Sequence, residues 1–340
     1  MRAAYPRDTP DQQRVATVAR VSTATVSRVF NSPHRVGEAR RNRVLQAAKE
    51  LGYTPNKFAS ALARKATGRV LFLDCNKLAA HDRVNQAYYA GLYKMSLEAV
   101  LGAVESSTYH LTIDLNGSAK PGDYDGIILF DVDSPEQVAP FLSSGIPTVY
   151  GHHLGGFSKG LRAGVDNKGG SVLAAQYLLD RGHRGIAYLT GRVPELNSHK
   201  DRLEGFVIRL EEANLGCTIL QTPVGPRGGA RGVQSLEKKL RAGSITAIGV
   251  MNDLTAFGAV QELLRLGIRI PEDVEVVGFD NLPILDLLPV RIPTVDLSLD
   301  EVYSRAAKKL LSSLESQGEQ EELLVLPRLI RPNSNPGDPK

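Results

Sequence analysis

The chain has 340 residues, 42% of them hydrophobic, which is enough to bury a substantial core in two or three domains. Its two cysteines, Cys75 and Cys217, stand far apart, so the sequence indicates neither a disulfide framework nor a zinc site and fits a reducing cytoplasm. No long apolar run and no export signal occur, so we expect a cytoplasmic protein that does not enter a membrane.

The net charge of +4 is divided unevenly along the chain. Residues 1–69 hold 14 Lys and Arg against 4 Asp and Glu, a net charge of +10, so the remainder carries −6. A basic end on an acidic body is expected where one end meets phosphate and the other does not. The alternative is a basic face that is merely solvated.

Residues 15–31 predict two short helices packed at a steep angle, because apolar residues recur there at helical spacing in two groups. The first group is Val15, Ala16 and Ala19, the second is Val26, Val29 and Phe30, and Arg20 and Val21 form the turn between them. Ser22 stands where the second helix should begin, and its hydroxyl can accept a hydrogen bond from a free backbone N–H of the first turn. This arrangement is a helix-turn-helix.

The second helix would bury its valines and present short polar side chains and one guanidinium to the outside. Arg28 can pair with the edge of a guanine, and small residues near the helix N-terminus allow a close approach to base edges in the major groove. The candidate DNA-contacting residues of this helix are Ser22, Thr23, Ala24, Thr25, Ser27, Arg28 and Asn31. Periodicity alone leaves open an amphipathic helix pair with another role.

The stretch VATVARVSTATVSRVFN, residues 15–31, closely resembles the headpiece of the LacI/GalR family of bacterial transcription regulators over seventeen consecutive positions. One departure is Arg20, where the family usually has the glycine of the turn. A left-handed conformation there would cost a non-glycine residue about 1 kcal/mol, so the turn is either strained or differently shaped.

A third helix is expected over residues 38–51, with Gly52 ending it. Residues 51–63 then resemble the hinge of the same family. The resemblance implies that two hinge helices, one from each protomer, meet in the minor groove, where Leu62, with Ala59 beside it, wedges into a base step. An ordinary linker helix that buries Leu62 against the body is the alternative.

From residue 69 onward, predicted strands alternate with predicted helices, which indicates an α/β core of two doubly wound parallel-sheet lobes. Strands are expected near 70–74, 110–115, 126–131, 147–150, 185–190 and 246–250, and helices near 86–101, 135–144, 170–181 and 201–213. The expected domains are an all-α helix-turn-helix headpiece over 1–52, a hinge helix or linker over 53–68, an N-terminal lobe over 69–165 plus about 293–322, and a C-terminal lobe over 166–290 plus about 323–334.

Motifs along this body, among them RGHR at 181–184, ND at 252–253 and VVGFDN at 276–281, also resemble the family, whose effector-binding core is similar to periplasmic sugar-binding proteins. Open α/β sheets bind ligands in the crevice at the carboxyl ends of their strands. The resemblance implies ligand contacts at Asn85, Arg202, Asn252 and Asp280. A guanidinium, amides and a carboxylate suit a hydroxyl-rich molecule. A salt bridge of Arg202 across the cleft and a turn cap at Asp280 are the alternatives.

The body departs from the family pattern at two places. Where many relatives carry an aromatic segment before the first core helix, this chain has Arg83, Val84 and Asn85. Only eight residues separate Leu115 from Tyr124, whereas a crossover between parallel strands normally needs a dozen or more. We therefore expect one helix of the N-terminal lobe to be missing, which would expose a sheet face or change its edge.

The sequence thus predicts a ligand-responsive, sequence-specific DNA-binding transcription regulator, a repressor of carbohydrate-related genes, and not an enzyme. The glycine-rich stretch 225–232 lacks the lysine and serine of a phosphate-binding loop, and no catalytic, metal or cofactor motif stands out. The expected partners are a near-palindromic double-stranded DNA operator, a small-molecule effector such as a sugar or sugar derivative, and a second copy of the chain. The alternative is a small-molecule-binding or enzymatic α/β protein with a non-functional head.

Overall fold

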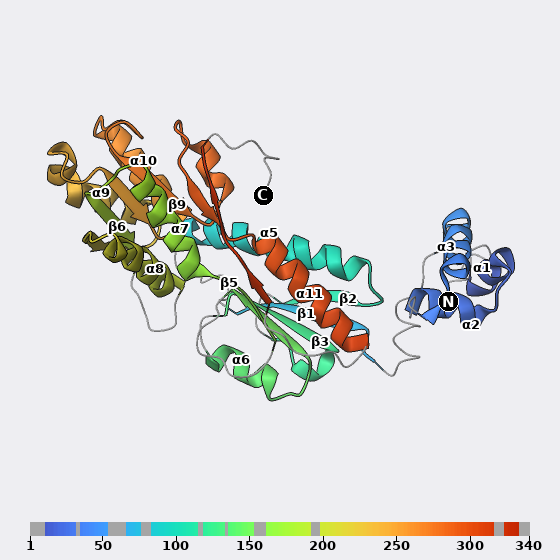
Figure 1. Cartoon of the computed structure of the whole chain (residues 1–340). Helices are drawn as coiled ribbons and strands as arrows, with labels where there is room; N and C mark the ends of the chain where they lie inside the picture. The colour runs from blue at the N-terminus through green and yellow to red at the C-terminus, as the bar shows by residue number, and fades with distance from the viewer. Residues whose placement is uncertain are drawn as a thin grey trace.

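The computed structural model describes residues 11–31, 35–53, 66–75, 83–114, 118–132, 135–152, 161–191, 198–315 and 323–332. Residues 11–53 contain three helices, and residues 66–332 contain two sheets flanked by helices (Figure 1). This architecture confirms the expected fold class of a helical headpiece followed by two doubly wound lobes. None of the helices in the described ranges is long and apolar enough to cross a membrane.

The headpiece helices are α1 (Gln12–Ala19), α2 (Thr23–Asn31) and α3 (Glu38–Leu51). They enclose a small core of buried aliphatic side chains, namely Val15, Ala16, Ala19, Val26, Val29, Val44, Ala47 and Ala48. Arg20 ends α1 in the left-handed region, with φ 53° and ψ 50°, and its N–H donates to the carbonyls of Ala16 and Thr17. Of the two alternatives for this turn, the structure therefore has the strained one.

The sheet of the N-terminal lobe has six strands, all parallel, in the order β11-β5-β4-β3-β1-β2. Their bounds are Leu323–Val325, Leu161–Val165, Thr148–His152, Gly126–Phe130, Arg69–Asp74 and His110–Asp114. Helices α5 (Arg83–Glu105) and α11 (Leu299–Glu315) cover one face, and α6 (Pro135–Leu142) covers part of the other (Figure 1). Burial on both faces explains why β1 and β3 are nearly continuous apolar runs.

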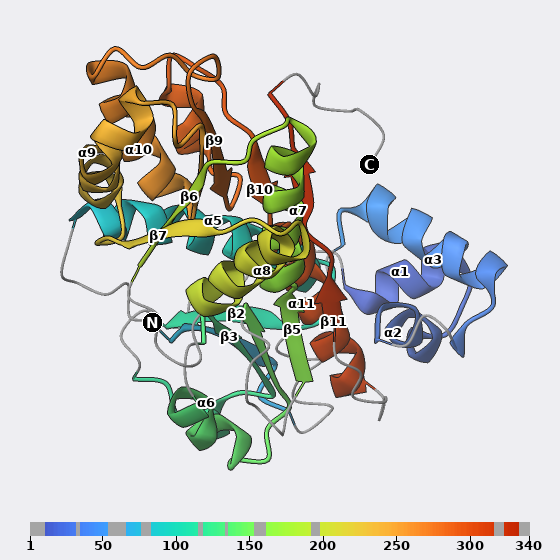
Figure 2. The same cartoon turned by 60° about the vertical axis from the view of Figure 1, so that its left-hand side comes forward.

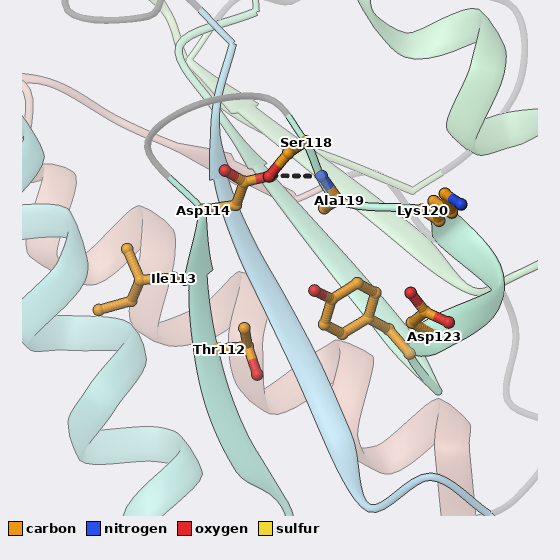
Figure 3. A pocket seen from close by; sticks show the side chains of 8 residues that line it. Thr112, Ile113, Asp114, Ser118, Ala119, Lys120 and Asp123 are labelled. Atoms are coloured by element: carbon orange, nitrogen blue, oxygen red, sulfur yellow. Dashed lines mark hydrogen bonds between the residues drawn. The ribbon is translucent and has the colours of Figure 1, made fainter.

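Strand β1 lies between β2 and β3, yet the described residues between β2 and β3 contain only the short 3-10 turn η2 (Pro121–Asp123). Tyr124 is packed on the face that a crossover helix would cover, and the Arg69 guanidinium lies 5.0 Å from the centre of its ring. Beside it is a pocket of about 510 Å³ lined by Thr112, Asp114 and Asp123 among others (Figure 3). The short connection has therefore changed the covering of this sheet face.

The sheet of the C-terminal lobe has the order β12-β10-β9-β8-β6-β7, parallel except for β12, which runs antiparallel to β10. The bounds are Arg328–Ile330, Thr294–Asp296, Glu275–Phe279, Ala247–Val250, Ile186–Thr190 and Cys217–Gln221. Helices α7 (Asn167–Asp180) and α8 (Ser198–Glu212) cover one face, and α9 (Pro226–Arg241) and α10 (Asp253–Arg265) cover the other (Figure 2). The helix η3 (Pro283–Leu287) follows β9.

Two short strands correct the boundaries expected near the C-terminus. Strand β10 pairs with β9 and so belongs to the C-terminal lobe, although residues 293–322 were expected in the N-terminal lobe. Strand β11 pairs with β5 in the N-terminal lobe, although residues 323–334 were expected in the other. Each strand has only three residues, too few for a local pattern to indicate which sheet it joins.

Candidate functional site

The outer face of α2 carries the candidate DNA contacts. Thr23, Ala24 and Arg28 are exposed, Ser27 is partly exposed, and these positions share one side of the helix. The opposite side is fixed by the buried valines of the headpiece core. The side chain of Asn31, the last residue of α2, is not among those described.

Ser22 caps α2, as its position in the sequence predicts. Its Oγ accepts from the backbone N–H of Thr25 at 3.2 Å, and it lies 2.9 Å from the Thr25 Oγ1. These contacts fix the first turn of the helix and hold the Thr25 hydroxyl beside the cap. The hinge candidates Ala59 and Leu62 lie outside the described residues.

The carboxyl ends of the strands in the C-terminal lobe gather three of the four candidate ligand contacts. Arg202 on α8 is 1% exposed, and its Nη1 lies 3.0 Å from Oδ1 of Asp280, which directly follows β9. The same Nη1 donates to the Met251 carbonyl at 2.7 Å, and Nε donates to Asn167 Oδ1 at 2.9 Å. The guanidinium also lies 4.1 Å from the centre of the Phe279 ring.

This pairing joins elements of one lobe, whereas the alternative was a salt bridge of Arg202 across the cleft. Asp280 does stand at a sharp turn, with φ 107°, a conformation that side-chain-bearing residues rarely adopt. Strain of this kind persists where the surroundings hold the residue, and here the buried guanidinium does so. The fourth candidate, Asn85, lies in the first turn of α5, and its side chain is not among those described.

Asn252 is fully buried at the start of α10. Its Oδ1 caps that helix by accepting from the Thr255 N–H at 2.9 Å, whereas its Nδ2 makes no hydrogen bond to any described residue. A buried donor without an acceptor costs about 1–3 kcal/mol. An acceptor atom of a ligand placed at the strand ends would remove that cost.

Two further side chains belong to this cluster, and the sequence reasoning did not select them. Asn167, at the start of α7, holds the Arg202 Nε as described above. Asp253 is fully buried and accepts from the Thr294 hydroxyl and the Leu282 N–H, both at 2.7 Å. Burial raises the pKa of Asp253 well above its ordinary value, and the charge of Asp280 acts in the same direction. Asp253 follows the strand predicted over residues 246–250, a signal that could have identified it, whereas Asn167 follows β5, a strand that the sequence analysis did not predict.

Two family models match separate parts of the chain. Residues 13–56 match bacterial regulatory proteins of the lacI family, and residues 175–334 match the periplasmic binding protein-like domain. The chain is 28% identical over 335 residues to the HTH-type transcriptional repressor PurR of Klebsiella pneumoniae subsp. pneumoniae, and the alignment covers 94% of this chain and 95% of that protein. The chain belongs to the LacI/GalR family.

Solved structures of LacI/GalR proteins have the same architecture. The transcriptional regulator CelR, in complex with cellobiose, is 26% identical and matches with a TM-score of 0.65 over 96% of this chain and 100% of its own. The Lac repressor bound to ONPG is 20% identical and matches with a TM-score of 0.64 over 95% of this chain and 98% of its own. At this identity the likeness shows a shared fold alone.

Membership in the LacI/GalR family decides between the two functions that the sequence left open. The protein is a transcriptional repressor with a DNA-binding headpiece and an effector-binding core, and not an enzyme. Its general partners are a DNA operator and a small-molecule effector.

Proposed function

We propose that the protein represses its target genes as a cytoplasmic homodimer on a near-palindromic operator, and that a small hydroxyl-rich effector, a sugar or sugar derivative, controls this binding. The observation that carries the effector proposal is the Nδ2 of Asn252, which has no hydrogen-bond partner among the described residues and lies beside the buried pair of Arg202 and Asp280. Amide, guanidinium and carboxylate groups together can donate to and accept from neighbouring hydroxyls. CelR, a structural relative, was solved with cellobiose.

The DNA-contacting residues of the proposal are those on the outer face of α2, together with Asn31 and the hinge pair Ala59 and Leu62, which rest on the family resemblance. Arg28→Ala should flatten base preference at one position of each half-site, at a cost of about 1–3 kcal/mol there. Selection from a random double-stranded DNA library measures this preference for each variant.

The matched control is Arg231→Ala, because Arg231 is an exposed arginine on α9, outside the headpiece. It should leave the selected sequences unchanged. An unaltered base preference in the Arg28→Ala protein would show that α2 does not contact bases as proposed.

The effector can be sought by thermal-shift screening of sugars, sugar phosphates and nucleobases. Asn252→Ser then tests the site, because serine retains a cap acceptor for α10 and removes the amide donor. We expect effector affinity to fall about tenfold or more, since one buried donor to the ligand is lost. Asp286→Ala, an exposed change in η3, should leave the affinity intact. Equal affinity in wild type and Asn252→Ser would remove the amide from the site.

We expect a homodimer because one recognition helix of nine residues contacts few base pairs, and two copies double the contacts to a palindromic site. Light scattering should give the mass of a dimer at micromolar concentration, and a stable tetramer would contradict the proposal.

Effector and operator bind the same molecule, so their effects on each other's affinity must be equal. The operator should change the affinity for the effector by the same factor by which the effector changes the affinity for the operator. Fluorescence anisotropy measures both factors.

A further inference from the structure

We infer that a second pocket in the C-terminal lobe binds a small organic anion, a carboxylate on an apolar body, at a site separate from the effector cleft. The pocket has a volume of about 590 Å³. It is lined by the end of α7, the start of β9, the segment before β10 and the residues after β12, and these include Tyr177, Arg181, Glu275, Arg291, Ile292 and Arg331.

The pocket lies at the far end of the lobe from the effector residues. Strand β9 begins at Glu275 in this pocket and ends at Phe279, against which Arg202 is stacked. Helix α7 begins at Asn167, which binds Arg202, and ends next to Arg181 in the pocket. A ligand here would therefore occupy a different surface from the proposed effector.

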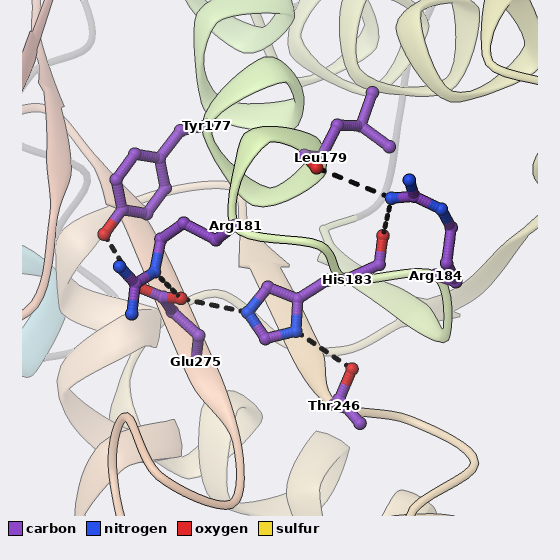
Figure 4. Close-up of polar contacts among 7 residues, drawn as sticks. All are labelled: Tyr177, Leu179, Arg181, His183, Arg184, Thr246 and Glu275. Atoms are coloured by element: carbon purple, nitrogen blue, oxygen red, sulfur yellow. Dashed lines mark hydrogen bonds and ion pairs between the residues drawn. The ribbon is translucent and has the colours of Figure 1, made fainter.

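Glu275 does not supply free negative charge to this pocket. Its side chain is 4% exposed, and it accepts from Tyr177 Oη at 2.6 Å and from Arg181 Nε at 2.5 Å (Figure 4). His183 Nε2 lies 2.9 Å from the same carboxylate, and its Nδ1 lies 2.9 Å from the Thr246 hydroxyl. Burial alone would raise the pKa of Glu275, but the hydrogen bonds from His183, Tyr177 and Arg181 outweigh it and hold the pKa below its ordinary value.

Three guanidinium groups line the pocket. Those of Arg181 and Arg331 lie 5.9 and 6.0 Å from the centre of the same Tyr177 ring. Arg291 is exposed and forms no hydrogen bond or ion pair with the residues that the structure describes. Among the described lining residues Asp180 is the only other carboxylate, so the cations exceed the acids there although the chain beyond residue 69 has a net charge of −6. An added anion would reduce the repulsion among these cations.

The walls determine the chemical class of the ligand. Ile270 and Ile292 are each 7% exposed, and Pro271, Pro293 and Pro332 add further apolar atoms to the lining. Arginine forks pair with planar carboxylates through two parallel hydrogen bonds, and the volume falls in the usual range for small-molecule sites. The pocket thus suits a carboxylate with an apolar body better than a bare inorganic ion.

Calorimetric titration of the full chain with benzoate, benzamide and inorganic phosphate tests the inference. Benzoate should bind saturably at one site per chain, and neutral benzamide and phosphate should each bind about tenfold more weakly or less. Arg291→Gln should weaken benzoate about fivefold or more, because an exposed side chain without a partner among the described residues can be replaced without unfolding the lobe.

Arg231→Gln and Asn252→Ser are the controls, and both should bind benzoate as the wild type does. The inference is overturned if benzoate shows no saturable binding, if benzamide binds equally well, or if Arg291→Gln has no effect. Loss of benzoate binding in Asn252→Ser but not in Arg291→Gln would place the anion in the effector cleft and would also overturn it. None of these outcomes affects the operator tests.

Discussion

Removal of the buried Arg202 side chain should destabilise the C-terminal lobe. Arg202→Met retains most of the buried volume but removes the cation. It leaves the Asp280 carboxylate without its buried partner and takes a donor from Asn167 and from the Met251 carbonyl. Breaking a buried ion pair by removing one partner costs about 3–5 kcal/mol, because the remaining charge stays desolvated. We expect a loss of stability in that range.

Urea unfolding followed by far-ultraviolet circular dichroism measures this loss, and the midpoint of the core transition should fall by about 1 M or more. The matched control is Arg209→Met on the same helix. Arg209 pairs with Gln176 and Glu212, but its side chain is 23% exposed and that of Glu212 is 63% exposed, so the control should cost less than about 1 kcal/mol. If Arg202→Met costs no more than Arg209→Met, the buried pair does not stabilise the lobe as argued.

Two further changes test other parts of the chain. Arg20→Gly should stabilise the headpiece by about 0.5–1 kcal/mol, because glycine adopts the left-handed turn without strain. Hydrogen exchange of the α1 amides in the full chain should then become slower, and unchanged or faster exchange would contradict this prediction. Glu275→Gln should destabilise the C-terminal lobe at about pH 7. Because the folded pKa of Glu275 lies below its ordinary value, its contribution is present above that value and is lost as pH falls through the folded pKa. Urea midpoints of variant and wild type should therefore converge as the pH falls below the ordinary pKa of a glutamate, and a difference that stays constant with pH would contradict the lowered pKa of Glu275.

The sequence by itself determined the headpiece, because its signals are local. Apolar spacing within residues 15–31 places the two helices, the Ser22 hydroxyl caps the second one, and Gly52 ends α3 with φ 63°. The short connection before Tyr124 likewise predicted an altered N-terminal lobe from chain length alone. Each of these depends on residues within a few turns of one another.

The candidate site was only partly accessible to such reasoning. Arg202, Asn252 and Asp280 could be selected from strand ends and from the family resemblance. The sequence does not show that Arg202 and Asp280 pair inside one lobe, or that the Asn252 amide donor has no partner among the residues that the structure describes. Burial and partners are set by how the strands are ordered in the sheet.

Tertiary structure alone decided the long-range contacts. Strands β10 and β11 join opposite sheets, although each has three residues, because backbone pairing is determined by the available edge of a sheet and not by local propensity. The contacts of Glu275 with Tyr177, Arg181 and His183 form for the same reason, since the end of α7 meets the start of β9 only after both are packed in the lobe. Local sequence chooses helix or strand over a few residues, whereas charge pairing between distant segments exists only once the fold has brought them together.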